Sequence, residues 1–453
     1  MRPTNEESIE VLTQLIRVDT CQPEGNEADI IPVIKNLMPD CCEFYVLEHG
    51  SNRQSLIAKI PGETEDGGFA FLGHVDTVAC GDKTQWTYDP HEAKVVDGIL
   101  YGRGAADMKG GVAAMIMTAR HLAASGQVPE RPIYFFFAAD EENSGTGAHA
   151  MESEGWMNDL DGMIVCEPSG ENTGFCEKGT LWIRLDIQGV ASHGSRPALG
   201  RNAVEFGMRF AQELKARALD GRQHDVLGET SMPVTRFHGG FMTNVIPSEA
   251  YLEMDIRTIP DTSHEAILRE AETIIGELKA EAVFDGVTCE LSVLNNMPPI
   301  ECEYESGFRE DICRAAEKAG IGTENRGLYY YTDAARVIPK HEMPFVIAGP
   351  GADSMAHVLN ECIPVDSVTR FTEFYLDYVK EHYYREGTGR TGHEERSALS
   401  FRGRPDTDPC HRVAAGRQTF GGAADLPRHV RIHRPVRRVR PFSERARLLC
   451  RRE

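Results

Sequence analysis

The stretch of sequence that decides the fold reads PIYFFFAADEE and covers residues 132–142. Its first eight residues are a continuous apolar run, which predicts a central parallel strand covered on both faces. Three carboxylates, Asp140, Glu141 and Glu142, follow the run. Crowded carboxylates repel one another unless a cation neutralises them. The stretch therefore predicts a buried strand that ends at a metal site, with a solvated acidic turn as the alternative.

Strand and helix patterns alternate on both sides of this stretch. We predict strands over 55–60, 68–74 and 163–165 and a buried helix over 110–125. Near the end of this region, the patterns predict a helix over 306–319, a strand over 344–348 and a helix over 365–384. This order is typical of a doubly wound α/β fold, whose functional groups lie at the carboxyl ends of the strands. We expect a catalytic domain of this class, built on a mixed sheet.

A different pattern begins after Gly179, where residues 180–187 alternate strictly between apolar and polar side chains. Such alternation predicts a half-exposed strand. Helices predicted over 202–218 and 263–280 and strands over 234–237, 250–257 and 288–293 complete a βαββαβ order, as in a ferredoxin-like domain. We therefore expect a discontinuous catalytic domain over 1–178 and 295–386, with residues 179–294 inserted into it.

The remaining residues, 387–453, differ in charge from the rest of the chain. They contain 16 Arg, no Lys and 7 acidic residues, which gives them a net charge of +9. Because the whole chain has a net charge of −22, residues 1–386 have a net charge of −31. A basic arm for nucleic acid or lipid is one interpretation of this tail. We favour a disordered appendage, because no apolar periodicity runs through it. The acidic main body disfavours nucleic acid or an anionic membrane as its partner.

The composition also indicates the cellular compartment in which the protein functions. The chain shows no run of about 18 apolar residues, and its first residues do not resemble a secretory leader. The 12 cysteines form no Cys-x-x-Cys pair, so we expect reduced thiols and neither a thiolate zinc site nor a disulfide scaffold. These features predict a cytoplasmic protein.

Further candidate ligands lie at other predicted strand ends. His74 and Asp76 are two residues apart in a strand, so both side chains can point to one face. Asp107 follows a run of small residues that permits close backbone approach, although a helix cap would also explain it. Glu167 follows the strand over 163–165, and His357 lies far downstream.

Taken in order, these motifs resemble the di-zinc aminoacylase and carboxypeptidase family. That family contains acetylornithine deacetylase, succinyl-diaminopimelate desuccinylase and the glutamate-releasing carboxypeptidases. The resemblance covers residues 5–385 and rests on residues 71–111, Asp140-Glu141-Glu142, Cys166-Glu167-Pro168 and residues 348–361.

The resemblance implies a role for each candidate ligand. One Zn²⁺ would be held by His74, Asp107 and Glu167, and the other by Asp107, Glu142 and His357. Asp107 would then bridge the two ions. Glu141 would be the general acid and base, and Asp76 would orient His74. Oxygen and imidazole ligands also allow Co²⁺ or Mn²⁺.

The resemblance also implies groups that recognise the substrate. His193 would reach the active site of a partner subunit in a homodimer and stabilise the oxyanion, so that the inserted domain carries the dimer interface. Asn244, Arg257 and Thr332 would bind a substrate carboxylate, although Arg257 could equally pair with Asp255 or Asp261. Succinyl-diaminopimelate desuccinylases place an Arg where this chain has Ala335, which weakens that one substrate assignment.

The expected function is hydrolysis of an amide bond by a water that two metals activate. The substrate would be a small, carboxylate-bearing N-acyl amino acid. A carboxypeptidase or dipeptidase that releases a C-terminal amino acid is the alternative, and a catalytically silent metal-binding scaffold is an alternative of another class. The motifs of serine hydrolases, P-loop enzymes and His-Glu-x-x-His proteases are not found in the sequence.

Overall fold

The computed structural model describes residues 2–50, 52–219, 221–302, 307–341 and 343–385, and the Arg-rich segment 387–453 lies outside them. Its larger sheet has the strand order β1-β2-β6-β3-β7-β18. These strands are β1 (Glu43–Gly50), β2 (Arg53–Ile60), β6 (Ile133–Ala138), β3 (Phe69–His74), β7 (Gly162–Pro168) and β18 (Phe345–Gly349).

The sheet is mixed, as predicted. β3 is parallel to both β6 and β7, and β18 is parallel to β7, whereas β2 is antiparallel to β1 and β6. The apolar run of residues 133–138 thus forms an inner strand, but only one of its two neighbours is parallel. A strand that is buried on both faces needs apolar side chains along its length, whether its neighbouring strands are parallel or antiparallel to it.

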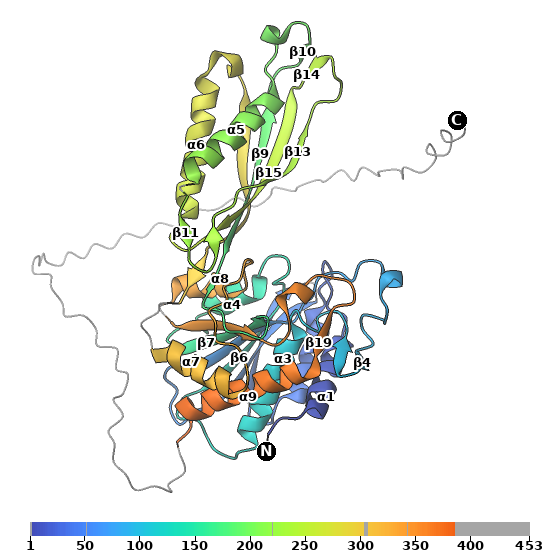
Figure 1. The fold of residues 1–453 in the computed structure, drawn as a ribbon, viewed down its shortest axis with the longest axis vertical. Helices are drawn as coiled ribbons and strands as arrows, with labels where there is room; N and C mark the ends of the chain where they lie inside the picture. Colours follow the sequence, from blue (N-terminus) through green and yellow to red (C-terminus); the bar gives the residue numbers. More distant parts are fainter. Residues whose placement is uncertain (1, 51, 220, 303–306, 342, 386–453) are drawn as a thin grey trace, which may run out of the picture. The chain divides into compact units, whose positions relative to one another are not determined.

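Helices α1 (Asn5–Ile16), α3 (Lys109–Ala123) and α9 (Val365–Tyr383) pack against one another beside this sheet (Figure 1). α3 is buried along almost its whole length, as its apolar sequence predicts. A Cβ atom at Gly111 would lie 2.1 Å from the carbonyl oxygen of Cys166. Glycine therefore lets the start of α3 approach β7 closely, next to Glu167.

Four further helices complete this part of the chain. α2 (Glu27–Leu37) packs on β2, α4 (Thr146–Ser153) contacts β1 and β6, α7 (Gly307–Lys318) packs on α9, and α8 (Ala334–Val337) contacts α4. The sequence patterns predicted α7 but not α2 or β1. Among the described residues, no helix is both long and apolar enough to cross a membrane.

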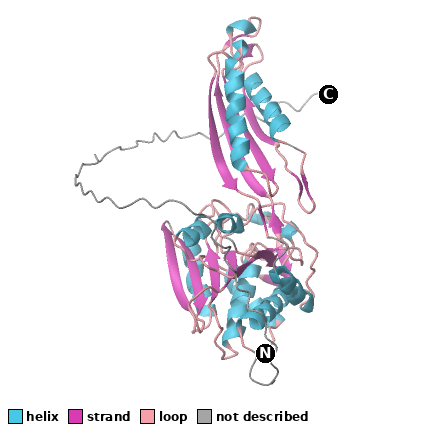
Figure 2. Ribbon diagram, turned by 90° about the vertical axis from the view of Figure 1, so that its left-hand side faces the viewer, coloured by secondary structure: helices cyan, strands magenta, loops and turns pink. Residues whose placement is uncertain are grey.

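The second sheet has the order β13-β15-β9-β16, and all its neighbours are antiparallel (Figure 2). Its strands are β9 (Gly179–Gln188), β13 (Val234–Gly239), β15 (Glu249–Thr258) and β16 (Thr288–Met297). Two helices, α5 (Ala203–Ala218) and α6 (His264–Ala280), share a hydrophobic core with this sheet. The chain order is the predicted βαββαβ, and the strand order is that of a ferredoxin-like sheet. The boundaries of the inserted domain stay a prediction.

Several very short strands were not predicted from the sequence. They are β4 (Lys94–Val96), β5 (Ile99–Tyr101), β8 (Cys176–Glu177), β10 (Ser192–His193), β11 (Gln223–His224), β12 (Gly228–Glu229), β14 (Val245–Ile246), β17 (Ile300–Glu301) and β19 (Cys362–Pro364). Two or three residues carry no measurable periodicity, and most of these strands pair with partners far away in the chain. One of the pairs, β10 with β14, holds the candidate site residue His193.

Candidate functional site

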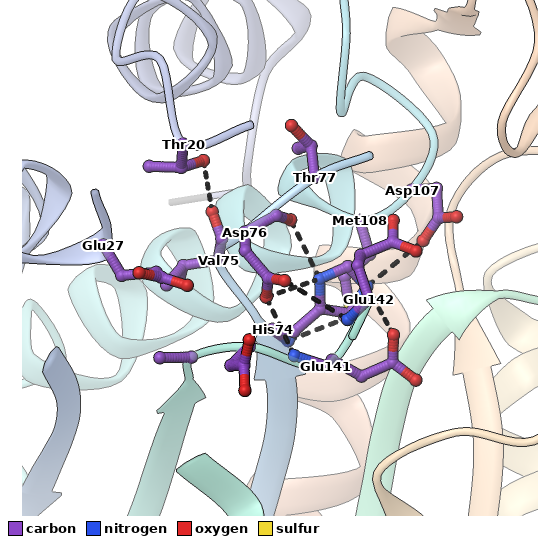
Figure 3. A network of polar contacts seen from close by, with 12 residues as sticks. Thr20, Glu27, His74, Val75, Asp76, Thr77, Asp107, Met108, Glu141 and Glu142 are labelled. Atoms are coloured by element: carbon purple, nitrogen blue, oxygen red, sulfur yellow. Dashed lines mark hydrogen bonds and ion pairs between the residues drawn. The ribbon is translucent and has the colours of Figure 1, made fainter. Parts of the chain in front are cut away.

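Three neighbouring strands bring acidic or imidazole side chains to one edge of the larger sheet. His74 is the last residue of β3, Glu141 and Glu142 follow β6, and Glu167 lies near the end of β7. Because β3 is parallel to β6 and β7, the carboxyl ends of these strands meet at this edge. Figure 3 shows His74, Asp76, Asp107, Glu141 and Glu142 gathered in one polar network.

Asp107 lies between two imidazoles. Its Oδ1 atom is 3.2 Å from Nε2 of His74, and its Oδ2 atom is 3.2 Å from Nε2 of His357. The same nitrogen of His74 is 3.5 Å from Oε1 of Glu167, and that of His357 is 2.8 Å from Oε2 of Glu142. The five candidate ligands thus form two groups of three side chains that share Asp107.

The charges in this cluster strongly shift one another's pKa values. Burial opposes ionisation of Asp107, but contacts with His357 and His74 outweigh burial and lower the pKa of Asp107. Burial and the nearby Asp107 raise the pKa of Glu142 to about 7, and contacts with Asp107 and Glu142 raise the pKa of His357 to about 10. The cluster therefore attracts positive charge, as protons on its imidazoles or as metal cations.

Glu141 lies at the edge of this cluster rather than within either group. Its Oε2 atom is 4.0 Å from Nε2 of His74, and the residue is 8% exposed. Burial and the adjacent carboxylates, Glu167 first among them, raise the pKa of Glu141 well above its usual range, against an opposing effect of His74. A carboxyl group with a raised pKa next to a metal site is suited to general acid and base chemistry.

The donor set fits a pair of divalent cations. Three carboxylates and two imidazoles converge, and Oε1 of Glu142 is buried without a hydrogen-bond partner among the described residues. A buried, unpaired carboxylate oxygen is costly unless a cation or a proton compensates it. His357 also adopts a left-handed backbone with φ of 62°, which costs a non-glycine residue about 1 kcal/mol or more. Such strain is concentrated at functional sites.

Asp76 supports the cluster in two ways. Its backbone carbonyl oxygen is 3.0 Å from Nδ1 of His74, and its Oδ1 atom is 3.6 Å from the same nitrogen. Its carboxylate also accepts hydrogen bonds from the backbone N–H groups of Glu141 and Glu142, at 3.1 and 3.2 Å. The side chain of Gln22 donates a further bond of 2.7 Å to it. Asp76 therefore holds the Glu141-Glu142 turn as well as the ring of His74.

Glu361 is a supporting residue to which the sequence analysis gave no role. It is fully buried and accepts hydrogen bonds from the backbone N–H groups of Gly104, Ala106 and Asp107, at 2.8–2.9 Å. Its carboxylate also pairs with Arg103 at 2.7 Å. These bonds fix the loop that presents Asp107. The available signal was the Asn360-Glu361 pair close to His357, which is part of the resemblance.

His193 and Asn244 lie elsewhere: His193 ends the short strand β10, and Asn244 is in the turn just before β14. β10 pairs with β14 so that His193 faces Val245, and the N–H of Gly194 donates to the carbonyl of Asn244 at 2.7 Å. Both residues are exposed. The ring of His193 contacts Oγ of Ser195 at 2.8 Å. The structure thus brings these two predicted residues together and leaves their side chains accessible.

Arg257 and Thr332 are engaged within the chain. The guanidinium of Arg257 donates to both carboxylate oxygens of Asp255, at 2.8 and 3.2 Å, which was one of its predicted alternatives. The hydroxyl of Thr332 is buried and donates to Glu177 at 2.8 Å. Roles for these residues in substrate binding stay predictions. Arg336, one place after Ala335, donates to the carbonyl of Ser144 at 2.8 Å and so supports the turn after Glu142.

Comparison with known proteins agrees with this geometry. Residues 70–381 match the peptidase family M20/M25/M40. The chain belongs to this family. Among its relatives is a probable succinyl-diaminopimelate desuccinylase of Staphylococcus aureus, 26% identical over 412 residues, which cover 83% of this chain and 99% of that protein. The match confirms the resemblance and makes the protein a hydrolase of a metallopeptidase family.

Solved structures share the fold. A tripeptidase from Staphylococcus aureus is 22% identical, with a TM-score of 0.66, and the match covers 83% of this chain and 98% of that one. The Bacillus subtilis YXEP protein, described as a dinuclear metal binding peptidase from the M20 family, is 17% identical with a TM-score of 0.62 and coverage of 83% and 97%. The predicted mixed α/β fold is therefore confirmed.

Proposed function

We propose that this M20-family protein is a metal-dependent amide hydrolase that removes an acyl group from a small N-acyl amino acid. One observation carries the proposal: the two carboxylate oxygens of Asp107 face different imidazoles, each 3.2 Å away. A carboxylate that paired with a single histidine would not need its two oxygens to face different imidazoles. A carboxylate that bridges two cations would need one oxygen directed at the ligands of each cation.

The proposed metal ligands are the two groups of three side chains. His74, Asp107 and Glu167 would hold one Zn²⁺, and Asp107, Glu142 and His357 would hold the other, with Co²⁺ or Mn²⁺ also compatible with these donors. A divalent metal pair supplies an acidified water and a Lewis acid for the amide carbonyl. Asp76 keeps the ring of His74 and the turn of Glu141 and Glu142 in place, because it contacts both.

Glu141 is proposed as the general base and acid. It lies beside both groups without belonging to either, with its Oε2 atom 4.0 Å from Nε2 of His74. Its carboxylate would take a proton from the attacking water and give it to the departing amine. Burial supports this double role, because it raises the pKa of Glu141 and so makes its carboxyl group a better proton acceptor than an exposed one.

Substrate recognition is assigned to the accessible pair His193 and Asn244, together with Arg257 and Thr332 as weaker candidates. His193 and Asn244 make few contacts of their own, so their side chains are free to meet a ligand or a second subunit. Exposed apolar residues from nearby segments accompany them, namely Val190, Leu199, Phe241 and Met242. These features support a homodimer in which the segment over 179–294 forms the interface and His193 serves the partner's site.

A direct test is amine release from a substrate panel. Purified protein loaded with Zn²⁺ or Co²⁺ is incubated with N-acetyl, N-succinyl and N-formyl amino acids and with unblocked dipeptides and tripeptides. We expect turnover of at least one N-acyl amino acid that carries a free carboxylate. Metal removal by a chelator should abolish it, and adding metal back should restore it. No release from the whole panel by metal-replete protein contradicts the proposal and supports a silent scaffold.

A second candidate function, hydrolysis of unblocked dipeptides, is favoured by Asp333. This residue is 3% exposed, and neither carboxylate oxygen has a hydrogen-bond partner among the described residues. It lies close enough to Glu141 for the two charges to interact. The ammonium group of a free peptide amino terminus would pair with such a carboxylate, whereas an N-acyl group would not. The same panel decides between the two, because it contains both N-acyl amino acids, whose amine is blocked, and peptides with a free amino terminus.

A further inference from the structure

A second cluster of metal-binding side chains lies apart from the proposed catalytic ligands. It consists of Cys21, Cys80 and His91, whose sulfur and nitrogen atoms all lie within 4.8 Å of one another. Sγ of Cys21 is 3.5 Å from Sγ of Cys80, which is 3.5 Å from Nε2 of His91. A carboxylate lies next to this group, because Oδ2 of Asp19 is 3.4 Å from the same nitrogen.

These separations match the edges of a zinc tetrahedron. With Zn–S bonds of about 2.3 Å and Zn–N bonds of about 2.0–2.1 Å, tetrahedral geometry places two sulfur ligands about 3.8 Å apart, and sulfur and nitrogen about 3.6 Å apart. A disulfide would require the two sulfur atoms to be about 2.05 Å apart. It would also leave His91 and Asp19 without a role. Cys21, Cys80 and His91 are therefore spaced for a shared central ion, and the carboxylate of Asp19 lies beside His91.

Neighbouring groups orient the donor atoms toward one another. Nδ1 of His91 is 3.2 Å from the carbonyl oxygen of Ile16, so this nitrogen carries the ring proton and leaves the lone pair of Nε2 directed at Cys80. The N–H of Cys21 donates to Oδ1 of Asp19 at 3.1 Å, which holds that carboxylate beside the cluster. Cys80 is 6% exposed, and its carbonyl accepts a bond of 2.9 Å from the indole of Trp86.

From this arrangement we propose that Cys21, Cys80, His91 and Asp19 bind a structural Zn²⁺ ion, separate from the catalytic metals. Two thiolates and an imidazole are typical zinc ligands, and both thiols give up their protons when the ion binds. The proposal is independent of the reaction that the protein catalyses.

The site would connect two segments that flank the catalytic cluster. Cys21 forms a β-bridge with Thr77, and the N–H of Gln22 donates to the carbonyl of Thr77 at 2.8 Å. The side chain of Gln22 then reaches Asp76, which holds the turn of Glu141 and Glu142. An ion held by Cys21 and Cys80 would fasten residues 19–22 to the chain after Asp76. We therefore expect zinc to stabilise the support of the catalytic turn without touching the reacting groups.

The test uses the thiolates as a spectroscopic label on the full-length protein. None of the proposed catalytic ligands is a cysteine, so a thiolate-to-Co²⁺ charge-transfer absorption in Co²⁺-loaded protein reports only a cysteine site. We expect this absorption in the wild type, its loss in Cys21→Ser and Cys80→Ser, and its retention in Cys313→Ser, a matched control at a half-buried thiol in α7. Elemental analysis of the reduced, Zn²⁺-loaded variants should show one ion per chain fewer than in the wild type.

Two results would overturn the proposal. One is wild-type protein that shows no such absorption during Co²⁺ titration, a measurement that needs no variant to fold. The other is a Cys21–Cys80 disulfide, found by mass spectrometry of peptides from protein purified without oxygen and with metal present. His91→Gln gives a further check, because it should weaken Zn²⁺ binding while both thiols remain, whereas a disulfide would form regardless of this change.

Discussion

The cluster around Asp107 and the pair of His193 and Asn244 show two opposite ways of presenting functional side chains. Around Asp107, ligands from the ends of β3, β6 and β7 are mostly buried, and each is held by named partners. His193 lies on the two-residue strand β10, Asn244 lies in the turn before β14, and both are exposed. All the candidate metal ligands around Asp107 come from one chain. His193 and Asn244, by contrast, would need a substrate or a second subunit as a binding partner.

This difference in burial determines how much ordering each region requires when a ligand binds. A buried site built on sheet ends is preorganised, so its chemistry depends on fixed charges and little ordering is required. An exposed histidine on a two-residue strand must be ordered by a substrate or a second subunit, and that ordering costs free energy. Substitutions in the buried region should therefore affect chemistry and stability, and those in the exposed region chemistry alone.

The largest effect on activity is expected from Glu141→Gln. This change keeps the size of the side chain but removes its ability to accept a proton, so kcat should fall by about 10²–10⁴-fold. Metal content should stay near that of the wild type, because Glu141 is proposed as a base and not a ligand. Steady-state kinetics and elemental analysis measure both quantities. Glu43→Gln, at an exposed carboxylate on β1, is the control, and unchanged turnover in Glu141→Gln would remove this residue from the mechanism.

The largest effect on stability is expected from Glu361→Ala. It leaves Arg103 buried without its carboxylate and three backbone N–H groups without an acceptor. Breaking such a buried pair should lower the free energy of unfolding by about 3–5 kcal/mol. Denaturant unfolding at fixed metal loading measures the loss. Glu373→Ala, which removes the half-buried partner of the exposed Arg2, should cost no more than about 1 kcal/mol, and a similar loss in both variants contradicts the prediction.

The buried region was also the more predictable one. The ends of apolar strands predicted His74, Glu141, Glu142 and Glu167 as neighbours, because parallel strands deliver their carboxyl ends to one edge. Glu361 received no role, since its partners lie more than 250 residues earlier in the chain and only the folded structure brings them together. The cluster of Cys21, Cys80 and His91 was missed for the same reason, as its spacing matches no local motif.

For the exposed region, His193→Ala is the discriminating change. If His193 stabilises the oxyanion across a dimer, kcat should fall by about 10²-fold. The free energy of unfolding should change by no more than about 0.5 kcal/mol, because the side chain is exposed. His238→Ala, at another exposed histidine near the same sheet, should leave both quantities unchanged. A mixture of His193→Ala and Glu141→Gln chains that regains turnover would support a shared site, and no recovery at any ratio would argue against it.

The smallest effect is expected from Asp333→Asn, and it is selective for the substrate. Asp333 belongs to the buried region, and its carboxylate accepts no hydrogen bond from the described residues. If its carboxylate receives the ammonium group of an unblocked peptide, its loss should raise KM for such peptides by about 10-fold, the value of a charge-assisted hydrogen bond of about 1.5 kcal/mol. Turnover of the N-acyl forms should stay the same, because they offer no charge at this position. An equal change for blocked and unblocked substrates would mean that Asp333 acts on the catalytic cluster and does not select the substrate.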